Sequence, residues 1–287
     1  MLLSSTLQLL RFHFSLFLMP VYWFALSQAP SVNTGHAILV FIILHLLVYP
    51  SSNGYNSYMD KDTGSIGGIQ HPMAPTRQLF MVSVALDIAA ILLSLLISVW
   101  FAAGIIAFIA ASRAYSYRGI RLKKYPVIGY LTVIIFQGAL IYFLVYHGAD
   151  SGKTFTQDWS AMLGASLLIG AFYPLTQVYQ HEQDRADGVL SISACLGYRG
   201  TFIFSMIIFL LSMLSLAWYF GNNFELDRFM LMQIFLLPAL VYFFWWMAKV
   251  FKNTSAANYK NSMMMNLVGS ASSNAAFLFI LISKHFE

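Results

Sequence analysis

The chain has 287 residues, of which 59% are hydrophobic and only 9% charged, and its mean hydropathy is +0.69. Soluble domains carry roughly 25% charged residues, so this composition excludes an ordinary soluble protein and indicates a polytopic membrane protein. The single cysteine, Cys195, excludes an intrachain disulfide and a multi-cysteine metal site. The net charge of +5 is better explained by the orientation of the chain in the membrane than by nucleic-acid binding.

Nine apolar stretches approach the length of about 20 residues that a membrane-spanning helix needs. The first is expected to be a retained helix rather than a cleaved signal. The apolar run 79–111 is nearly continuous, and we divide it within 98–104. The sequence therefore predicts an all-α integral membrane protein. Its nine spans are 9–28, 36–54, 78–98, 100–117, 126–146, 160–179, 200–220, 229–249 and 262–283.

Basic residues in the loops predict how the chain is oriented. Nine spans place the N-terminus on the same side as four loops, at residues 55–77, 118–125, 180–199 and 250–261. Thirteen of the sixteen Lys and Arg fall on or near that side, and the other side has Lys153, Arg228 and Lys284. Because positively charged loops favour the cytoplasm, we expect this side to be cytoplasmic, in a bacterial-type inner membrane.

A polar cluster at residues 53–62 follows the second predicted span. Read as a helix, it places Asn53, Asn56 and Asp60 at i, i+3 and i+7, on one face. The alternative interpretation is a solvated helix end at the membrane surface. Asp62 is equally compatible with facing this cluster or facing water.

A second polar cluster, at residues 180–188, follows another apolar run, with Gln180, Asp184 and Asp187 at i, i+4 and i+7. Both clusters lie on the predicted cytoplasmic side, which suggests that two oxygen-bearing faces share one site. Carboxylates and amides suit a hard divalent cation, and Mg²⁺ commonly bridges protein carboxylates to substrate phosphates.

Other charged residues could complete such a site. Arg121, Lys123 and Lys124 form a basic loop that could hold an anion beside the metal, although ordinary positive-inside residues look the same. Arg11 begins an apolar segment, where snorkelling to the interface explains it equally well. Asp87 lies inside a predicted span without an obvious partner, so we expect a buried hydrogen bond or a neutral, protonated acid.

Four segments together resemble the UbiA superfamily of membrane prenyltransferases, and the likeness covers most of the chain. Each segment alone is a weak signal, but their order and their common predicted side make the set fairly specific. The segments are the asparagine-led cluster at 53–62, the stretch 114–129 with Ala114-Tyr115-Ser116 and Arg121 to Pro126, the run Asp184-Arg185-Ala186-Asp187-Gly188, and Asn258-Tyr259-Lys260-Asn261 with Met265-Asn266.

The resemblance implies a single domain over residues 1–287, with nine spans around a central cavity and two diverged halves, roughly 1–150 and 151–287. Family members transfer a prenyl group from an isoprenyl diphosphate to an acceptor, often aromatic, within the membrane and with Mg²⁺. The implied metal ligands are Asn53, Asn56, Asp60, Asp184 and Asp187. The implied substrate contacts are Arg11, Asn53, Asn56, Arg77, Arg121, Lys124, Gln180, Arg185 and Lys260, with Asp60, Asp184 and Lys123 as the catalytic residues.

The chain also departs from the family pattern. The first motif usually reads Asn-Asp-x-x-Asp-x-x-x-Asp, and in an alignment on Asn53 all three aspartates are replaced, by Gly54, Ser57 and Lys61. In the second motif Gln180 replaces the leading aspartate and leaves Asp184, and His71-Pro72 stands where an Arg-Pro is usual.

These departures keep a second hypothesis open. Either neutral amides such as Asn56 and Gln180 act as metal ligands, or metal affinity is reduced, or the activity has changed. The alternative function is a non-catalytic membrane protein that binds an isoprenoid or a partner on the same scaffold. A secondary transporter fits the hydropathy but not the clustering of polar motifs on one side.

Overall fold

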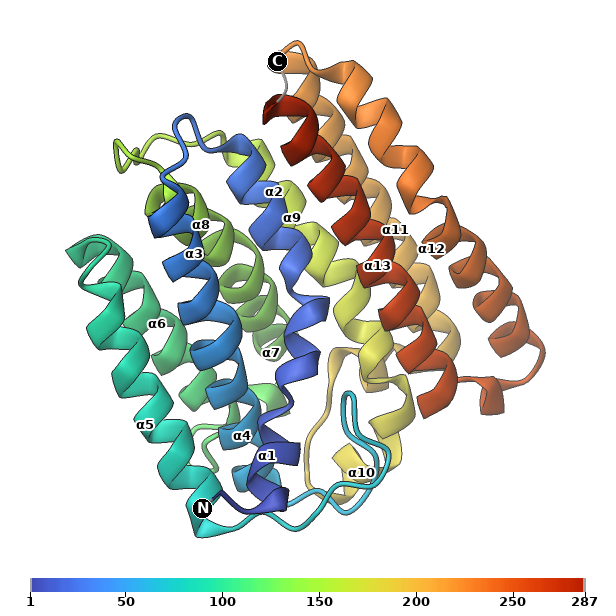
Figure 1. Cartoon of the computed structure of the whole chain (residues 1–287). Coiled ribbons are helices and arrows are strands. Elements are labelled where there is room, and N and C mark those ends of the chain that lie inside the picture. Colours follow the sequence, from blue (N-terminus) through green and yellow to red (C-terminus); the bar gives the residue numbers. More distant parts are fainter. Residues whose placement is uncertain (1, 286–287) are drawn as a thin grey trace.

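The computed structural model describes residues 2–285, and within them every regular element is helical (Figure 1). The α-helices lie side by side as a tilted bundle. They are α1 (Ser4–Leu10), α2 (Met19–Gln28), α3 (Thr34–Phe41), α4 (Tyr49–Asp60), α5 (Arg77–Ser94), α6 (Val99–Ser116), α7 (Pro126–Ile134), α8 (Ile141–Ala149), α9 (Trp159–Phe172), α10 (His181–Ala186), α11 (Ile192–Asn222), α12 (Leu226–Lys252) and α13 (Tyr259–His285).

The nine expected membrane spans correspond to these helices. Within residues 2–285, eight continuous stretches are long and apolar enough to cross a membrane, and the pair Ser4–Phe17 and Met19–Gln28, bent by 45°, gives a ninth when it is counted as one span. The largest extensions beyond a predicted C-terminal end are those of the second and sixth spans, which continue to Asp60 and to Ala186. Their last turns are polar, so hydropathy underestimates the helix there. The divide between the third and fourth spans lies at Leu95–Ser98, slightly earlier than predicted.

Irregular turns interrupt several spans. The second contains a π-helix, η2 (Ile42–Val48), and the fifth contains another, η4 (Ile135–Leu140). Within η4, a Cβ on Gly138 would lie only 2.4 Å from the Cα of Ser166, so the glycine lets this turn pack directly on α9. At Gly197 the backbone turns with φ 68°, a left-handed conformation that glycine adopts without strain.

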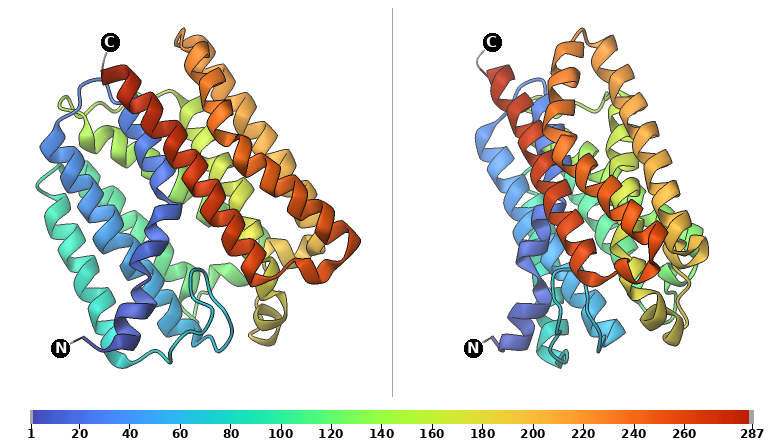
Figure 2. Two further views of the ribbon diagram at one scale, coloured as in Figure 1. Left: turned by 45° about the vertical axis from the view of Figure 1, so that its right-hand side comes forward. Right: turned by 90° about the vertical axis from the view of Figure 1, so that its right-hand side faces the viewer.

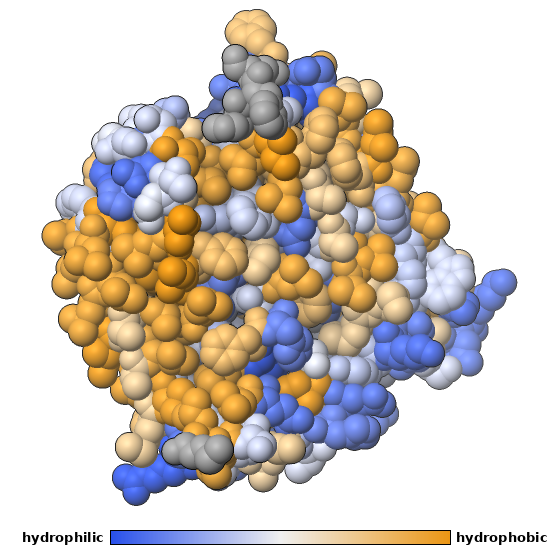
Figure 3. Space-filling view, viewed as in Figure 1, coloured by the Kyte–Doolittle hydropathy of each residue, from blue (hydrophilic) through white to orange (hydrophobic). Residues whose placement is uncertain are grey.

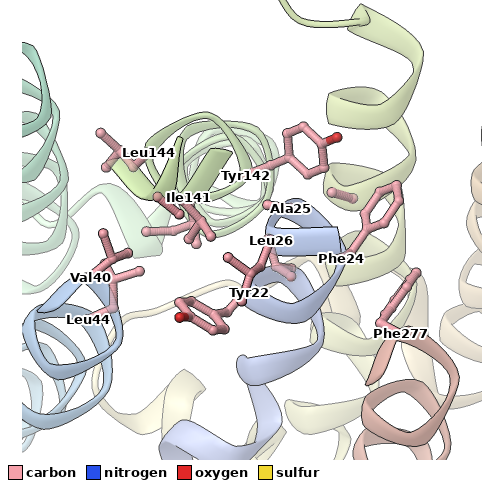
Figure 4. Close-up of a cluster of buried hydrophobic side chains, with 14 of the residues drawn as sticks. Tyr22, Phe24, Ala25, Leu26, Val40, Leu44, Ile141, Tyr142, Leu144 and Phe277 are labelled. Carbon is pink, nitrogen blue, oxygen red and sulfur yellow. The ribbon is translucent and has the colours of Figure 1, made fainter. Parts of the chain in front are cut away.

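A core rich in aromatic side chains joins the two halves of the chain (Figure 4). Phe24 of α2 stacks on Phe277 of α13 with ring centroids 4.7 Å apart, and its ring also meets Tyr142 of α8 at 5.1 Å. Val40 and Leu44 are fully buried in the same cluster. Because lipid is as apolar as these side chains, close packing rather than water exclusion stabilises this core.

The two ends of the bundle differ in character. The N-terminus, α10 and the loop at residues 61–76 lie at one end, and the C-terminus lies at the other (Figures 1 and 2). In Figure 3 apolar side chains cover most of the mid-height of the molecule, while hydrophilic residues gather mainly toward the lower edge and the upper rim. This distribution fits a bundle that is surrounded by lipid at its middle.

The opposite end is closed by hydrogen bonds that centre on Asp150. Its buried carboxylate accepts from the backbone of Ser31 at 3.0 Å and from the backbone and hydroxyl of Thr154 at 3.0 and 2.7 Å. Burial opposes ionisation, but these hydrogen bonds outweigh it and lower the pKa of Asp150. The loops before α3 and before α9 are thereby tied together.

Asp87 has a partner that the sequence did not reveal. Its carboxylate forms an ion pair with Arg113 of α6 and accepts a hydrogen bond from Ser51 Oγ of α4 at 2.5 Å. The expected buried hydrogen bond is therefore present, together with an ion pair that the sequence did not predict. Antiparallel packing of α5 against α6 brings the two charges together, and the pair fixes α4, which carries the first polar cluster.

Candidate active site

A cavity of about 290 Å³ opens between the spans at the end that carries the polar clusters. Its mouth is lined by charged and amide side chains from the turn after α1, from α4 and the loop after it, from α10 and the turn before it, and from the loop before α7. Its depth is lined mainly by apolar side chains, among them Phe108, Val133, Phe136, Leu168 and Ile169. One end can therefore hold an anion or a cation, and the other an apolar chain.

The first polar cluster faces this cavity as predicted. Asn53, Asn56 and Asp60 all line it, and Ser116 Oγ donates to Asn56 Oδ1 at 2.9 Å. Gly54 points the other way, because a Cβ there would lie 2.6 Å from Ser83 Oγ.

This geometry favours a different alignment of the first motif. Counted from Asn56 instead of Asn53, the motif places Asp60 at its second aspartate, with Ser57 and Gly64 in place of the other two. Both Asn56 and Asp60 line the cavity, so this alignment agrees with the fold. One aspartate of the motif is then retained rather than none.

Only part of the second polar cluster, residues 180–188, lines the cavity. Gln180 and Asp184 line it, and the Asp184 carboxylate makes no hydrogen bond or ion pair with any residue in 2–285. The predicted third member, Asp187, does not line the cavity, because α10 ends at Ala186. Asp187 instead pairs with Arg121 and, at 3.3 Å, with Arg118.

Asp60 is the most strongly paired carboxylate of the site. Lys123 Nζ bonds to its Oδ2, and Arg121 Nη2 lies 3.6 Å from its Oδ1. This Oδ1 is nevertheless buried, and no group within residues 2–285 donates a hydrogen bond to it. Lys123 also lines the cavity, so the predicted metal ligand and the predicted phosphate ligand are in direct contact.

Asp62 is a further carboxylate of the mouth. It lines the cavity and accepts from Gln183 Nε2 at 2.5 Å. Burial, followed by the charge of Asp60, raises the pKa of Asp62 to about 6. Three carboxylates, those of Asp60, Asp62 and Asp184, therefore line the mouth, and their oxygens are suitable ligands for a divalent cation.

Arg11 is held inside the cavity wall by an unusual turn. Its backbone is left-handed, with φ 48°, and its guanidinium donates to the carbonyl oxygens of Gly67 and Asn53, both at 3.3 Å. The side chain is buried and forms no ion pair with any residue in 2–285. A buried guanidinium whose hydrogen bonds go only to neutral carbonyls can still bind an anion.

Several residues implied by the resemblance lie away from this cavity. Arg121 is buried between the carboxylates of Asp60 and Asp187 rather than on the cavity lining. Four others are exposed and also outside the lining, namely Arg77, Lys124, Arg185 and Lys260.

The donor set limits the kind of metal site that is possible. No three His, Cys, Asp or Glu side chains within residues 2–285 converge closely enough to hold a metal ion by themselves. Asp60 Oδ1, which accepts no hydrogen bond from residues 2–285, and the Asp184 carboxylate do fit a single Mg²⁺, which is commonly held by one or two carboxylates together with substrate phosphates.

A row of uncharged polar groups was missed by the sequence reasoning. Tyr115 and Tyr173 share a short hydrogen bond between their hydroxyls, and Gln177 Nε2 donates to Tyr173 at 2.9 Å. All three line the cavity. Gln177 precedes Gln180 and Asp184 at helical spacing, so the same periodicity argument could have found it, whereas no such signal identifies the tyrosines.

The fold and the site define a polytopic helical membrane protein with a charged mouth on an otherwise apolar cavity. The sequence model of the UbiA prenyltransferase family matches residues 17–268. The chain therefore belongs to this family, as the four segments indicated.

Solved structures share the same fold. A UbiA homolog from Archaeoglobus fulgidus bound to GPP and Mg²⁺ matches with a TM-score of 0.70 and 17% identity, over 97% of this chain and 100% of that chain. The apo structure of a UbiA homolog from Aeropyrum pernix K1 gives 0.70 and 16%, over 94% and 98%. A digeranylgeranylglyceryl phosphate synthase gives 0.64 and 17%, over 98% of both chains. A comparison with curated proteins found no match.

Proposed function

We propose that this protein transfers a prenyl group from an isoprenyl diphosphate to an acceptor within the membrane, with Mg²⁺. One observation carries the proposal: Asp60 and Asp184, from distant segments, line the same cavity mouth as Lys123 and Arg11, above an apolar depth. The relatives bound to GPP and Mg²⁺ or to DMAPP and Mg²⁺ support this choice of substrate and metal.

The diphosphate is assigned to the mouth. Arg11 offers a guanidinium that pairs with no carboxylate in the described part of the chain, residues 2–285, and Lys123 can shift from Asp60 toward a phosphate oxygen. Asp60 and Asp184 would hold Mg²⁺, with Asn56 and Gln180 as neutral oxygen donors. When bound, Mg²⁺ supplies positive charge that stabilises the leaving diphosphate. Asp187 is left out of this set because it faces Arg118 and Arg121.

We assign the prenyl chain to the apolar inner part of the cavity. The C1–oxygen bond of an allylic diphosphate breaks with its electron pair on the diphosphate and leaves an allylic carbocation. Rings that line the cavity, such as Phe108 and Tyr115, can stabilise this cation through their faces. The apolar walls exclude the water that would otherwise capture it.

A release assay tests the proposed function. We expect the purified protein in lipid nanodiscs, given labelled geranyl or longer isoprenyl diphosphates and Mg²⁺, to release diphosphate and to prenylate an acceptor from a panel. Asp60→Asn and Asp184→Asn should each lower the rate by roughly 100-fold, the scale for one electrostatic contact to the transition state. The exposed Asp227 at the other end supplies the control, since Asp227→Asn should leave the rate unchanged. No release at any chain length would contradict the proposal.

The alternative function is binding of an isoprenoid without catalysis. It is favoured by the ion pair between Lys123 and Asp60, which already compensates the one retained aspartate of the first motif. It predicts isoprenoid binding that survives chelation and is insensitive to Asp60→Ala combined with Asp184→Ala.

We further propose that the cavity mouth faces the cytoplasm in a bacterial-type inner membrane. The support is the loop charge, since thirteen of the sixteen Lys and Arg fall on or near this side. A cysteine-labelling experiment with a membrane-impermeant reagent at position 71 tests this orientation, because His71 is exposed at the same end. Labelling in intact cells, without permeabilisation of the inner membrane, would contradict it.

A further inference from the structure

A second cavity, of about 340 Å³, lies between α11 and α12. Its walls are almost entirely apolar, and the side chains from these two helices include Met206, Leu210, Met213, Leu240 and Phe244. Leu210 and Phe244 are also exposed on the outer surface of the bundle, so the second cavity opens toward the surrounding lipid. A lipid chain can therefore enter it from the side.

One polar group inside the second cavity has no partner. Ser205 lines the cavity and is only 2% exposed, and its Oγ forms no hydrogen bond with any group in residues 2–285. The hydroxyl is not returned to the carbonyl oxygen one turn earlier, as is common for a serine within a helix. The lining amide, Gln233, does have a partner, since its Nε2 donates to the carbonyl oxygen of Phe229 at 3.3 Å. An unpaired hydroxyl in apolar surroundings is costly, which indicates that a ligand supplies an acceptor.

A cationic side chain lies at one end of the second cavity. Arg199 precedes Met206 and Leu210 by 7 and 11 residues, which places it on the face of α11 that lines the cavity. Its guanidinium donates to the carbonyl oxygen of Phe251, near the end of α12, at 2.9 Å. Arg199 therefore connects the two helices that form the cavity, at the end of the bundle that also carries the mouth of the first cavity.

This end of the second cavity can bind an anion. Arg199 and Lys252 are exposed, and neither forms an ion pair with any residue in 2–285. Lys252 directly follows Phe251, whose carbonyl oxygen Arg199 contacts. A guanidinium has five N–H donors, so one bond to a carbonyl oxygen leaves several for a phosphate group. Basic side chains at the membrane end of an apolar cavity favour an anionic lipid head group.

The groups follow one another in a definite order along α11. Ser205 comes six residues after Arg199, or about 9 Å along the helix, and Met213 lies about 12 Å further on. Cation, hydroxyl donor and apolar wall are therefore met in turn on the way into the membrane. A glycerophospholipid carries its phosphate, its ester carbonyl groups and its acyl chains in the same order.

We propose that the second cavity is a binding site for an anionic glycerophospholipid. The phosphate contacts Arg199 and Lys252, Ser205 Oγ donates to an ester carbonyl oxygen, and one acyl chain fills the apolar part. This site lies outside the proposed catalytic cavity and does not depend on prenyl transfer. The other possible occupant is the far end of a prenyl chain, since Phe172 lines both cavities. A prenyl chain end has neither a charge for Arg199 nor an acceptor for Ser205, so the phospholipid accounts for more of the site.

Native mass spectrometry of the full chain in detergent tests the phosphate contact. The two probes are dioleoyl phosphatidylglycerol, which is anionic, and dioleoyl phosphatidylcholine, which has the same chains and no net charge. The wild-type protein should bind the anionic lipid at least roughly fivefold more tightly, the scale for one cation near an anionic head group. Arg199→Gln should largely abolish this preference. The matched control is Arg77→Gln, because Arg77 is an exposed arginine at the same end, on α5, and this variant should keep the preference.

An ether-linked analogue of the same phosphatidylglycerol tests the hydroxyl contact. It lacks the ester carbonyl groups, so the wild-type protein should bind it roughly threefold or more weakly than the diester, the scale for one lost hydrogen bond. Ser205→Ala should bind the diester and the ether lipid equally.

Four results would overturn the site. They are wild-type protein that binds neither phospholipid, equal binding of the two head groups, equal loss of the preference in Arg77→Gln and Arg199→Gln, and equal binding of diester and ether lipid by the wild type. Displacement of phosphatidylglycerol by farnesol, an uncharged isoprenoid, would also contradict the proposal, because it would assign the second cavity to a prenyl chain.

Discussion

The ion pair between Asp87 and Arg113 gives the sharpest prediction about stability. The two side chains are 11% and 19% exposed, and they lie within membrane-spanning helices. Removing one partner of a buried pair costs about 3–5 kcal/mol, whereas apolar replacement of both is often nearly neutral. We expect Arg113→Met to cost about 3 kcal/mol, because the lone carboxylate can take up a proton. Asp87→Leu should cost about 5 kcal/mol, because a guanidinium stays charged.

The double variant provides the decisive comparison. Combining Asp87→Leu with Arg113→Met removes both charges, so its loss of stability should be about 1 kcal/mol or less. The free energy of unfolding can be measured in mixed micelles as the fraction of SDS is raised. A double variant whose loss equals the sum of the two single losses would refute the reasoning, because it would show that the two charges do not depend on each other.

Two other features of the fold carry predictions. Gly138→Ala places a Cβ 2.4 Å from the Cα of Ser166, so the free energy of unfolding should fall by about 1–3 kcal/mol, whereas Gly221→Ala, with nothing within 4 Å, should not lower it. At Asp150 the pKa lies below its ordinary value of 3.8, so the carboxylate stabilises the fold above that pH and this contribution is lost as the pH falls below it. Thermal unfolding should therefore show Asp150→Asn less stable than the wild type at pH 7, with a gap that narrows below pH 3.8; a gap independent of pH would contradict this.

The sequence predicted the positions of the membrane spans because apolar length is a local property. The helical spacing of Asn53, Asn56 and Asp60 also survives in the structure, since one helix face turns toward one neighbour. The residue at which a helix ends depends less on the local sequence. The end of α10 at Ala186 turns Asp187 away from the cavity, and nothing in the spacing of the acidic residues signals that end.

Contacts between distant segments could not be predicted in the same way. Arg113 meets Asp87, and Lys123 meets Asp60, only because particular helices pack side by side. Arg11 looked like a snorkelling residue, but its left-handed turn brings it back onto Asn53, 42 residues away. The spacing of residues in the sequence predicts which of them share a helix face. The packing of the helices decides which other residues that face contacts.

Binding of geranyl thiolodiphosphate with and without Mg²⁺ tests the central claim most directly. If Asp60 and Asp184 hold Mg²⁺ against the diphosphate, chelation by EDTA should weaken binding by at least roughly tenfold. The Asp60→Ala and Asp184→Ala double variant should bind equally weakly in Mg²⁺ and in EDTA. Binding by the wild-type protein that is unchanged by EDTA, and matched by the double variant, would contradict the account.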